Sequence, residues 1–216
     1  MEKSETLGAS TGAAAVARAR RALEAAVRGG SGRDPVRTLS SDPVPDELRD
    51  PRGVFVTLQT YPKGRLRGCI GFPLPVFPLH VAIARAAAAA ALEDPRFPPV
   101  GPQELEGLTV EVSILSVPVR LEGPPLERPS KIVIGRDGLI ADSGDSSGLL
   151  LPQVAPEQGW DAVEFLEGVC EKADLPKHAW RNASTRILQF HADVFRETVP
   201  GGVAIRSPSI PRDGET

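Results

Sequence analysis

Two alternating segments separated by a short turn constrain the fold of this chain most strongly. Val54 to Thr60 and Arg65 to Phe72 alternate in side-chain character with the period of two that is typical of a strand. The residues between them, Tyr61-Pro62-Lys63-Gly64, favour a turn. The pattern predicts a β-hairpin, and hence an antiparallel pairing of strands.

Helical and strand patterns are mixed along the rest of the chain without a regular β-α-β alternation. Leu108 to Leu115 places its apolar side chains on one face, and Arg186 to Arg196 alternates as a last strand. We predict a second hairpin from residues 131–134 and 139–141. The predicted helices cover residues 11–28, 79–93 and 161–173. Together these elements predict an α+β fold with a mainly antiparallel sheet flanked by helices.

The composition excludes several classes of protein. The chain of 216 residues has a net charge of −3 and 41% hydrophobic residues, which allows a sizeable core but gives no basic patch for nucleic acid. No apolar run approaches the roughly 20 residues of a membrane-spanning helix. Arginines interrupt the N-terminal segment where a signal peptide needs an apolar core. We therefore expect a cytoplasmic protein that binds neither DNA nor a membrane, with Cys69 and Cys170 as free thiols.

The amino-acid usage also bears on the source of the chain. It contains 22 prolines and one methionine. Many loop prolines and few thermolabile residues are typical of thermophilic proteins. A GC-rich genome produces much of the same bias, so the sequence leaves both origins open.

The segment Leu66-Arg67-Gly68-Cys69-Ile70-Gly71 carries the most chemistry. Read as a strand, it places Arg65, Arg67 and Cys69 on one face and its apolar side chains, including Leu66, on the other. A cation close to a thiol favours the reactive thiolate form. The alternative is a buried structural cysteine in a strand relaxed by glycine.

Further residues join the predicted site around Cys69. Gly68 and Gly71 lack side chains, so that backbone or a ligand can approach closely. Arg96 lies in a proline-stiffened loop that could form the wall of a cleft or cap the preceding helix. Glu111 is a mid-strand carboxylate, and it would serve either as a general base with a raised pKa or in a structural ion pair with a neighbouring arginine.

Motifs for other chemistries do not occur in the sequence. No grouping of His, Cys, Asp and Glu has the spacing of a zinc site, and no dinucleotide or P-loop fingerprint is found, so neither a metal nor a cofactor is predicted. A Cys–His pair would need His80, His178 or His191 close to Cys69 in space. The candidate catalytic residues are Cys69 and Glu111. The candidate ligand-cleft residues are Arg65, Arg67, Gly68, Cys69, Gly71 and Arg96.

Four sequence blocks resemble the AMMECR domain family, named after the chromosomal region deleted in AMME syndrome. The blocks are Gly53–Leu58, Leu66–Gly71, Asp94–Pro99 with Glu111–Leu115, and Gly148–Val154 leading to Gly159-Trp160. The resemblance implies an AMMECR domain over residues 13–202, with a larger lobe, a smaller lobe and a cleft between them. Residues 203–216 are predicted to be a disordered C-terminal tail.

The resemblance also implies partners. Family members often occur beside a Memo-like protein of dioxygenase fold and a radical-SAM enzyme, which implies a shared pathway. Because no catalytic dyad or cofactor motif is found, we predict a binding or accessory component with a small-molecule or peptide ligand in a cleft around Leu66–Gly71. The alternative is an enzyme that uses Cys69 as nucleophile or thiol ligand, with Arg67 and Glu111 in support.

Overall fold

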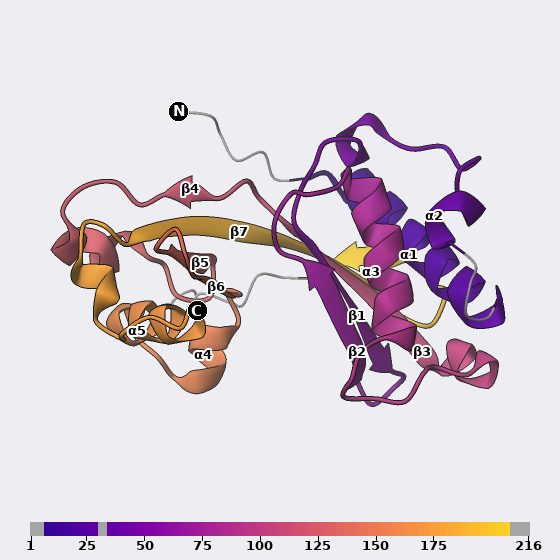
Figure 1. Ribbon diagram of the computed structural model, residues 1–216. Coiled ribbons are helices and arrows are strands. Elements are labelled where there is room, and N and C mark those ends of the chain that lie inside the picture. The colour runs from indigo at the N-terminus through magenta and orange to yellow at the C-terminus, as the bar shows by residue number, and fades with distance from the viewer. Residues whose placement is uncertain (1–6, 30–33, 208–216) are drawn as a thin grey trace, which may run out of the picture. The chain divides into compact units, whose positions relative to one another are not determined.

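Residues 7–29 and 34–207 are described by a computed structural model, in which the chain divides into two units (Figure 1). The first unit contains the described residues up to Ile114 together with Asp193–Ser207, and the second contains Leu115–Ala192. Strand β7 (Arg186–Glu197) contributes its first residues to the second unit and its last residues to the first. Both units combine helices with antiparallel strand pairs, so the predicted α+β class is confirmed.

The sheet of the first unit is built on the predicted hairpin. β1 (Val54–Thr60) pairs antiparallel with β2 (Arg65–Phe72) on one side and with β3 (Leu108–Leu115) on the other, and β3 neighbours β7. Val56 and Leu58 of β1 are buried in the hydrophobic core, as the period of two requires. β2 is therefore the edge strand of this sheet.

Two alanine-rich helices cover the buried face of this sheet. α1 (Ala9–Gly29) packs on α3 (Leu79–Leu92), and α3 packs on β1 and β2 (Figure 1). Alanine is the strongest helix former, and its small side chain lets a helix lie close to a sheet. The predicted helices at 11–28 and 79–93 are confirmed with small shifts at their ends. Short helical segments complete the unit: α2 (Pro35–Thr38), η1 (Asp46–Leu48) and η2 (Pro102–Gly107).

The second unit packs helices on a smaller group of strands. Asp161 caps the start of helix α5 (Ala162–Lys172), because its carboxylate accepts the backbone N–H groups of Val163 and Glu164. Its residue Phe165 is fully buried in the core of this unit. The predicted helix at 161–173 is thus confirmed. The other elements are β4 (Val119–Arg120), η3 (Pro125–Lys131), β5 (Asp137–Asp142), β6 (Ser147–Leu150), α4 (Val154–Gln158) and η4 (Ala179–Arg181).

The second hairpin forms in a different place from the one predicted. β5 pairs with β6 through a turn in which the Ser143 N–H donates to the Ser146 carbonyl. Residues 131–134, predicted as a strand, lie instead at the end of η3 and in the turn that follows. The Asp137 carboxylate closes that turn by accepting the Val133 N–H over 2.7 Å. The strand prediction is wrong because this side chain takes the backbone group that a strand would have paired.

The C-terminal segment is ordered at its start. β8 (Ala204–Arg206) pairs antiparallel with the end of β7, and Arg206 donates hydrogen bonds to Asp193 and to the Leu7 carbonyl. The prediction of a disordered tail from residue 203 onward is therefore wrong for β8. The remaining residues of that prediction, 208–216, lie outside the described residues.

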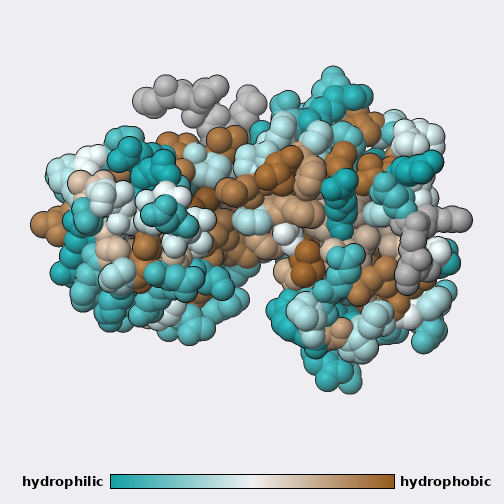
Figure 2. Space-filling view, in the orientation of Figure 1, coloured by the Kyte–Doolittle hydropathy of each residue, from teal (hydrophilic) through white to brown (hydrophobic). Residues whose placement is uncertain are grey.

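Most buried apolar side chains of the described residues belong to one of two clusters, the first in the first unit and the second in the second unit. On the face drawn in Figure 2, hydrophilic residues cover much of each unit, and hydrophobic residues show in smaller groups between them. Within residues 7–29 and 34–207, no helix is both long and apolar enough to cross a membrane.

Gly68 of β2 should tolerate no side chain. A Cβ added there would lie 2.1 Å from the carbonyl oxygen of Ala90 in α3, which is backbone and cannot rotate away. We expect Gly68→Ala to lower the free energy of unfolding, measured in urea, by about 2–3 kcal/mol through overpacking. Gly107→Ala is the matched control, because a Cβ there meets nothing within 4 Å. Equal effects of the two substitutions would contradict the close approach of α3 to β2.

Candidate functional site

A break in the register of the β1–β2 hairpin decides which side chains surround the cysteine. Leu58 pairs with Gly68, but the next residue of β1, Gln59, pairs with Leu66. Arg67 is therefore an extra residue in β2, as in a β-bulge. The extra residue reverses the alternation of side chains in the part of β2 that precedes it.

The bulge moves Arg65 away from the face of Cys69. Arg65 is exposed and stands opposite Thr60. Leu66, which simple alternation turns toward the core, has 42% of its surface exposed. Both placements predicted by alternation are wrong, because alternation holds only where two strands pair without an extra residue. Ile70, beyond the bulge, packs against the core as predicted.

Cys69, Thr57 and Glu111 lie in one row across three strands. Thr57 of β1 is the register partner of both Cys69 in β2 and Glu111 in β3. Its hydroxyl donates a hydrogen bond to Cys69 Sγ over 3.3 Å. Neighbouring strands lie about 4.8 Å apart, so roughly 10 Å separates the Cα atoms of Cys69 and Glu111. The two candidate catalytic residues therefore share a surface, with Thr57 between them.

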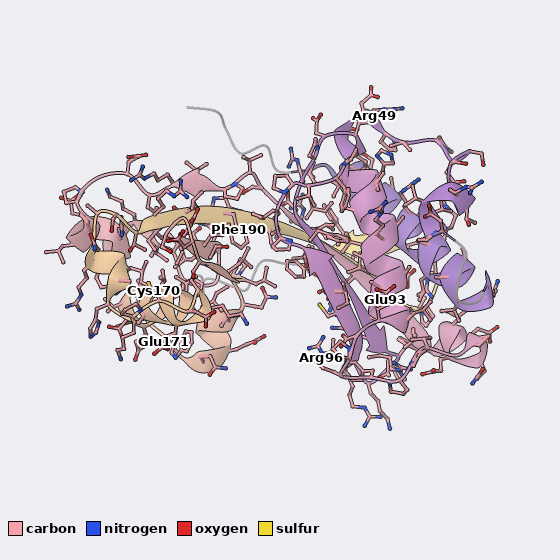
Figure 3. All side chains as sticks on the ribbon, viewed as in Figure 1. Arg49, Glu93, Arg96, Cys170, Glu171 and Phe190 are labelled. Atoms are coloured by element: carbon pink, nitrogen blue, oxygen red, sulfur yellow. The ribbon has the colours of Figure 1, made fainter. Side chains whose placement is uncertain are left out.

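The loop that follows α3 holds the backbone of Cys69 on the open edge of the sheet. The buried carboxylate of Asp94 accepts the Cys69 N–H over 2.8 Å. The same carboxylate accepts Arg96 Nε at 2.9 Å and Arg96 Nη2 at 2.7 Å. Arg96 Nη2 also donates to the Cys69 carbonyl over 3.2 Å, and Figure 3 shows Arg96 beside the strands of the first unit. Asp94 and Arg96 thus form a clamp on both backbone polar groups of Cys69.

This clamp sets the charges around the thiol. The hydrogen bonds from the Arg96 side chain, supported by the Cys69 N–H, hold the pKa of Asp94 well below its usual range although burial opposes them. Asp94 raises the pKa of Arg96 in turn, and the Cys69 side chain contributes to that rise. Arg96 is therefore the arginine that hydrogen-bonds to Cys69, through the backbone carbonyl of that residue.

Arg67 pairs with a carboxylate other than Glu111. Its Nε and Nη2 donate to the two carboxylate oxygens of Glu104 in η2, over 2.9 and 3.1 Å. Such a bidentate pair has a fixed geometry. The guanidinium carbons of Arg67 and Arg96 lie 5.9 and 5.6 Å from the centre of the Phe97 ring. Arg67 is thereby drawn to the loop that carries the clamp.

The two glycines of the motif serve the packing of the chain itself. The place of a Cβ at Gly68 is taken by the backbone of α3, as described above. At Gly71 a Cβ would lie 2.4 Å from both the Phe55 ring and the Val54 carbonyl oxygen. The sequence predicts that either backbone or a ligand approaches these two glycines closely. In the structure, atoms of the protein itself occupy the space beside Gly68 and Gly71.

Glu111 forms no ion pair with Arg67 or Arg96, since each of these arginines holds another carboxylate. Burial raises the pKa of Glu111, and the charge of Arg196 opposes this rise. A carboxylate with a raised pKa accepts a proton more readily at neutral pH. Its environment is therefore of the kind that a general base requires.

The three histidines are engaged with other residues. Each has Nδ1 close to an oxygen: His80 at 3.0 Å from the Leu48 carbonyl, His178 at 3.0 Å from Glu167, and His191 at 3.1 Å from Asp137. None of these contacts provides a base for the thiol. Within the described ranges, no group of three His, Cys, Asp or Glu side chains is placed to hold a metal ion.

Two contacts of the site were not predicted from the sequence. Asp94 and the backbone of Arg96 form a local turn, with the Arg96 N–H donating to Asp94 Oδ1 over 3.1 Å. An aspartate two residues before a turn residue is the signal for such a turn and could have found it. The pairing of Arg67 with Glu104 joins residues 37 positions apart and has no local signal.

Comparison with known proteins finds relatives of this chain along most of its length. The sequence profile of the AMMECR1 family matches residues 16–195. A protein from Thermococcus gammatolerans is 52% identical over 195 residues, which cover 89% of this chain and 93% of that protein. One from Pyrococcus furiosus is 49% identical over 197 residues, covering 90% of this chain and 91% of that protein.

A solved structure extends the likeness to the fold. The crystal structure of the uncharacterized protein PH0010 from Pyrococcus horikoshii superposes with a TM-score of 0.80 at 46% identity. The superposition covers 94% of this chain and 100% of that one. These three relatives come from thermophilic archaea.

Asp94→Asn should lower the free energy of unfolding by about 2 kcal/mol at neutral pH, because Arg96 and the Cys69 N–H lose a charged acceptor. The pKa of Asp94 is lowered in the folded chain, so its stabilisation is present above the ordinary value of about 4 and is lost as the pH falls below it. Urea unfolding at a series of pH values should show a difference from wild type that shrinks in acid.

The matched control is Asp46→Asn, at a side chain that is 97% exposed. It should change the free energy of unfolding by less than about 0.5 kcal/mol at every pH. A difference between Asp94→Asn and wild type that stays constant into acid would contradict the clamp.

Glu111→Gln should make the chain more stable at alkaline pH. The raised pKa means that the charged form of Glu111 opposes folding above the ordinary value of about 4.3. Removing the charge should raise the free energy of unfolding by up to about 1 kcal/mol near pH 8 and leave it unchanged near pH 4. Glu106→Gln, at an exposed residue, is the control. A loss of stability at alkaline pH would instead indicate a cation paired with Glu111.

Proposed function

This chain belongs to the AMMECR1 family, and we propose on that premise that it is a binding or accessory component whose ligand lies on the surface around Leu66–Gly71. The ligand is a small molecule or a peptide with a polar acceptor group. The proposed partners are those that the family resemblance implies, a Memo-like protein and a radical-SAM enzyme. In this role the chain holds the ligand and leaves its conversion to a partner.

The observation that supports the proposal is the clamp of Asp94 and Arg96 on Cys69. It fixes the backbone of an edge strand, whose free groups would otherwise pair with water or another chain. Asp94 also fixes the guanidinium of Arg96, whose side chain remains 54% exposed, in the same place. Donors that are fixed before binding lose little entropy when an acceptor group arrives, which favours recognition.

The ligand cleft belongs to the same proposal. Its walls in the first unit would be the outer face of β2 and the loop Asp94–Phe97. The Phe97 ring, flanked by the guanidinium groups of Arg67 and Arg96, offers a flat apolar surface beside the polar clamp. A ligand that combines a polar acceptor with a planar part fits these two features.

Native mass spectrometry of the chain purified from cells of its natural source tests the proposal. Wild type should carry a noncovalent mass that is lost in Arg96→Gln and retained in Arg65→Gln, and a crystal structure should place its density beside Cys69. Density elsewhere in the first unit, or equal retention by both variants, would contradict a ligand at the clamp.

Cys69 should be the more reactive of the two thiols. Cys69 is partly exposed and Arg96 donates to its carbonyl oxygen, whereas Cys170 is buried in α5 of the second unit (Figure 3), where burial raises the pKa of its thiol. We expect Cys69 to be alkylated by iodoacetamide at neutral pH at least about tenfold faster, measured by peptide mass spectrometry. Preferential labelling of Cys170 would contradict an accessible surface at Cys69.

Two variants identify the cation that acts on Cys69. Arg96→Gln should slow the alkylation of Cys69 by about threefold or more, because the positive charge at the thiol is removed. Arg65→Gln makes the same change at an exposed residue of β2, the strand that carries Cys69, and should leave the rate within about twofold. A larger decrease in the alkylation rate for Arg65→Gln than for Arg96→Gln would instead support the arrangement predicted by simple alternation, in which Arg65 lies on the same face as Cys69.

A second candidate function is an enzyme that uses Cys69 as nucleophile or thiol ligand, with Arg67 and Glu111 in support. The row of Cys69, Thr57 and Glu111 favours it, because a substrate lying over Thr57 could meet both the thiol and a carboxylate of raised pKa. A covalent adduct on Cys69 in the intact mass of the purified chain would support this candidate. A ligand that dissociates intact supports the binding role.

A further inference from the structure

Glu111 carries a carboxylate that the described part of the chain leaves unpaired. Its neighbours in β3, Val110 and Val112, are buried in the core of the first unit, so Glu111 lies on the face of the sheet that α3 does not cover. The residue is neither fully buried nor fully exposed. Within residues 7–29 and 34–207, no hydrogen bond or ion pair reaches its carboxylate. A ligand on this face can therefore reach it.

The side chains in the row of Cys69, Thr57 and Glu111 offer acceptors. Thr57 is the register partner of Glu111, and its hydroxyl proton is directed to Cys69 Sγ over 3.3 Å. The oxygen of Thr57 keeps its lone pairs for a further hydrogen bond, and an ionised carboxylate only accepts. The middle of the row and its end at Glu111 therefore suit a ligand group that donates.

The charges around Glu111 favour a cation. Burial raises the pKa of Glu111, and the charge of Arg196, an exposed residue of β7, offsets only part of this effect. The arginines of the clamp and of the bulge each hold another carboxylate. A positive charge that arrives with a ligand would stabilise the ionised form of Glu111.

A primary ammonium group supplies three donors and one positive charge. The row crosses three strands, whereas a peptide that adds to a sheet runs along its edge strand, so the row suits a small molecule. On the basis of the function proposed above, we propose that the ligand is a small amine whose ammonium group binds Glu111 and Thr57 and whose acceptor group meets Arg96. The two groups then lie apart on the scale of the roughly 10 Å between the Cα atoms of Cys69 and Glu111.

The probe for this arrangement is para-aminomethylbenzoate, which carries an ammonium group and a carboxylate at opposite ends of a planar ring. Its binding to the full-length chain can be measured by isothermal titration calorimetry at neutral pH. Para-methylbenzoate keeps the ring and the carboxylate but lacks the amine. It should bind at least about tenfold more weakly, because the hydrogen bonds to a charged carboxylate are lost. Equal affinities of the two compounds would overturn the assignment of an amine.

Variants at Glu111 locate the ammonium group. Glu111→Gln should remove the preference for the amine, so that the two affinities differ by less than about twofold. Glu106→Gln makes the same change at an exposed residue of η2 and should retain the preference of wild type. A preference that persists in Glu111→Gln would overturn the place of the ammonium group.

Variants at Thr57 test the second acceptor. Thr57→Val removes the hydroxyl and should reduce the preference for the amine by about threefold or more. Thr57→Ser retains the hydroxyl and should retain the preference. Equal preferences in these two variants would overturn the contact of the ammonium group with Thr57.

Arg96→Gln separates the amine from the ligand site on which it rests. It should weaken the binding of both compounds, because each carries the carboxylate that meets Arg96. Binding that depends on Arg96 without a preference for the amine would overturn the amine alone. A preference that depends on Glu111 while Arg96→Gln has no effect would contradict the ligand site at the clamp and support the amine.

A peptide competitor tests the class of the ligand. Tri-alanine, which has an ammonium group at one end and a carboxylate at the other, should not displace para-aminomethylbenzoate. Displacement would overturn the small molecule in favour of a peptide N-terminus. Failure of wild type to bind either benzoate would contradict both the amine and the ligand site at the clamp.

Discussion

Arg20 of α1 and Glu197 at the end of β7 form a buried ion pair on which the arrangement of the first unit depends. Their side chains are 9% and 2% exposed. Arg20 also donates to the Leu105 and Leu108 carbonyls, and Glu197 accepts the Val110 N–H over 3.0 Å. A buried ion pair is tolerated only when its remaining donors and acceptors are satisfied, which these backbone groups achieve. The pair ties α1 to β3, β7 and η2, and so joins the helical layer to the sheet.

The contacts at Cys69 follow from that arrangement. α1 holds α3 against β1 and β2, and Gly68 lets the backbone of α3 approach at Ala90. Asp94 follows shortly after the end of α3, so the same approach brings its carboxylate to the N–H of Cys69, the neighbour of Gly68. The order of residues in the motif therefore has a physical reason. Gly68 has no side chain and lets the backbone of α3 pack against β2, and the adjacent Cys69 hydrogen-bonds to Asp94 in the loop that follows α3.

The sequence predicted the elements of this site better than their contacts. Alternation and turn residues were enough to predict the hairpin, and alanine-rich composition was enough to predict α3, because both signals are local. The bulge at Arg67 was not predictable, since it depends on how β2 pairs with β1. Once it forms, Leu66 changes face and Arg67 meets Glu104.

Proton transfer limits the chemistry that the contacts of Cys69 can support. A nucleophilic thiol needs a base that takes its proton. Thr57 donates to the sulfur, Arg96 brings a positive charge, and Asp94 has a lowered pKa and is occupied by its own donors. The carboxylate with a raised pKa, Glu111, stands across Thr57 in the next strand but one. A reaction at Cys69 would therefore require a substrate that carries its own base or that bridges to Glu111.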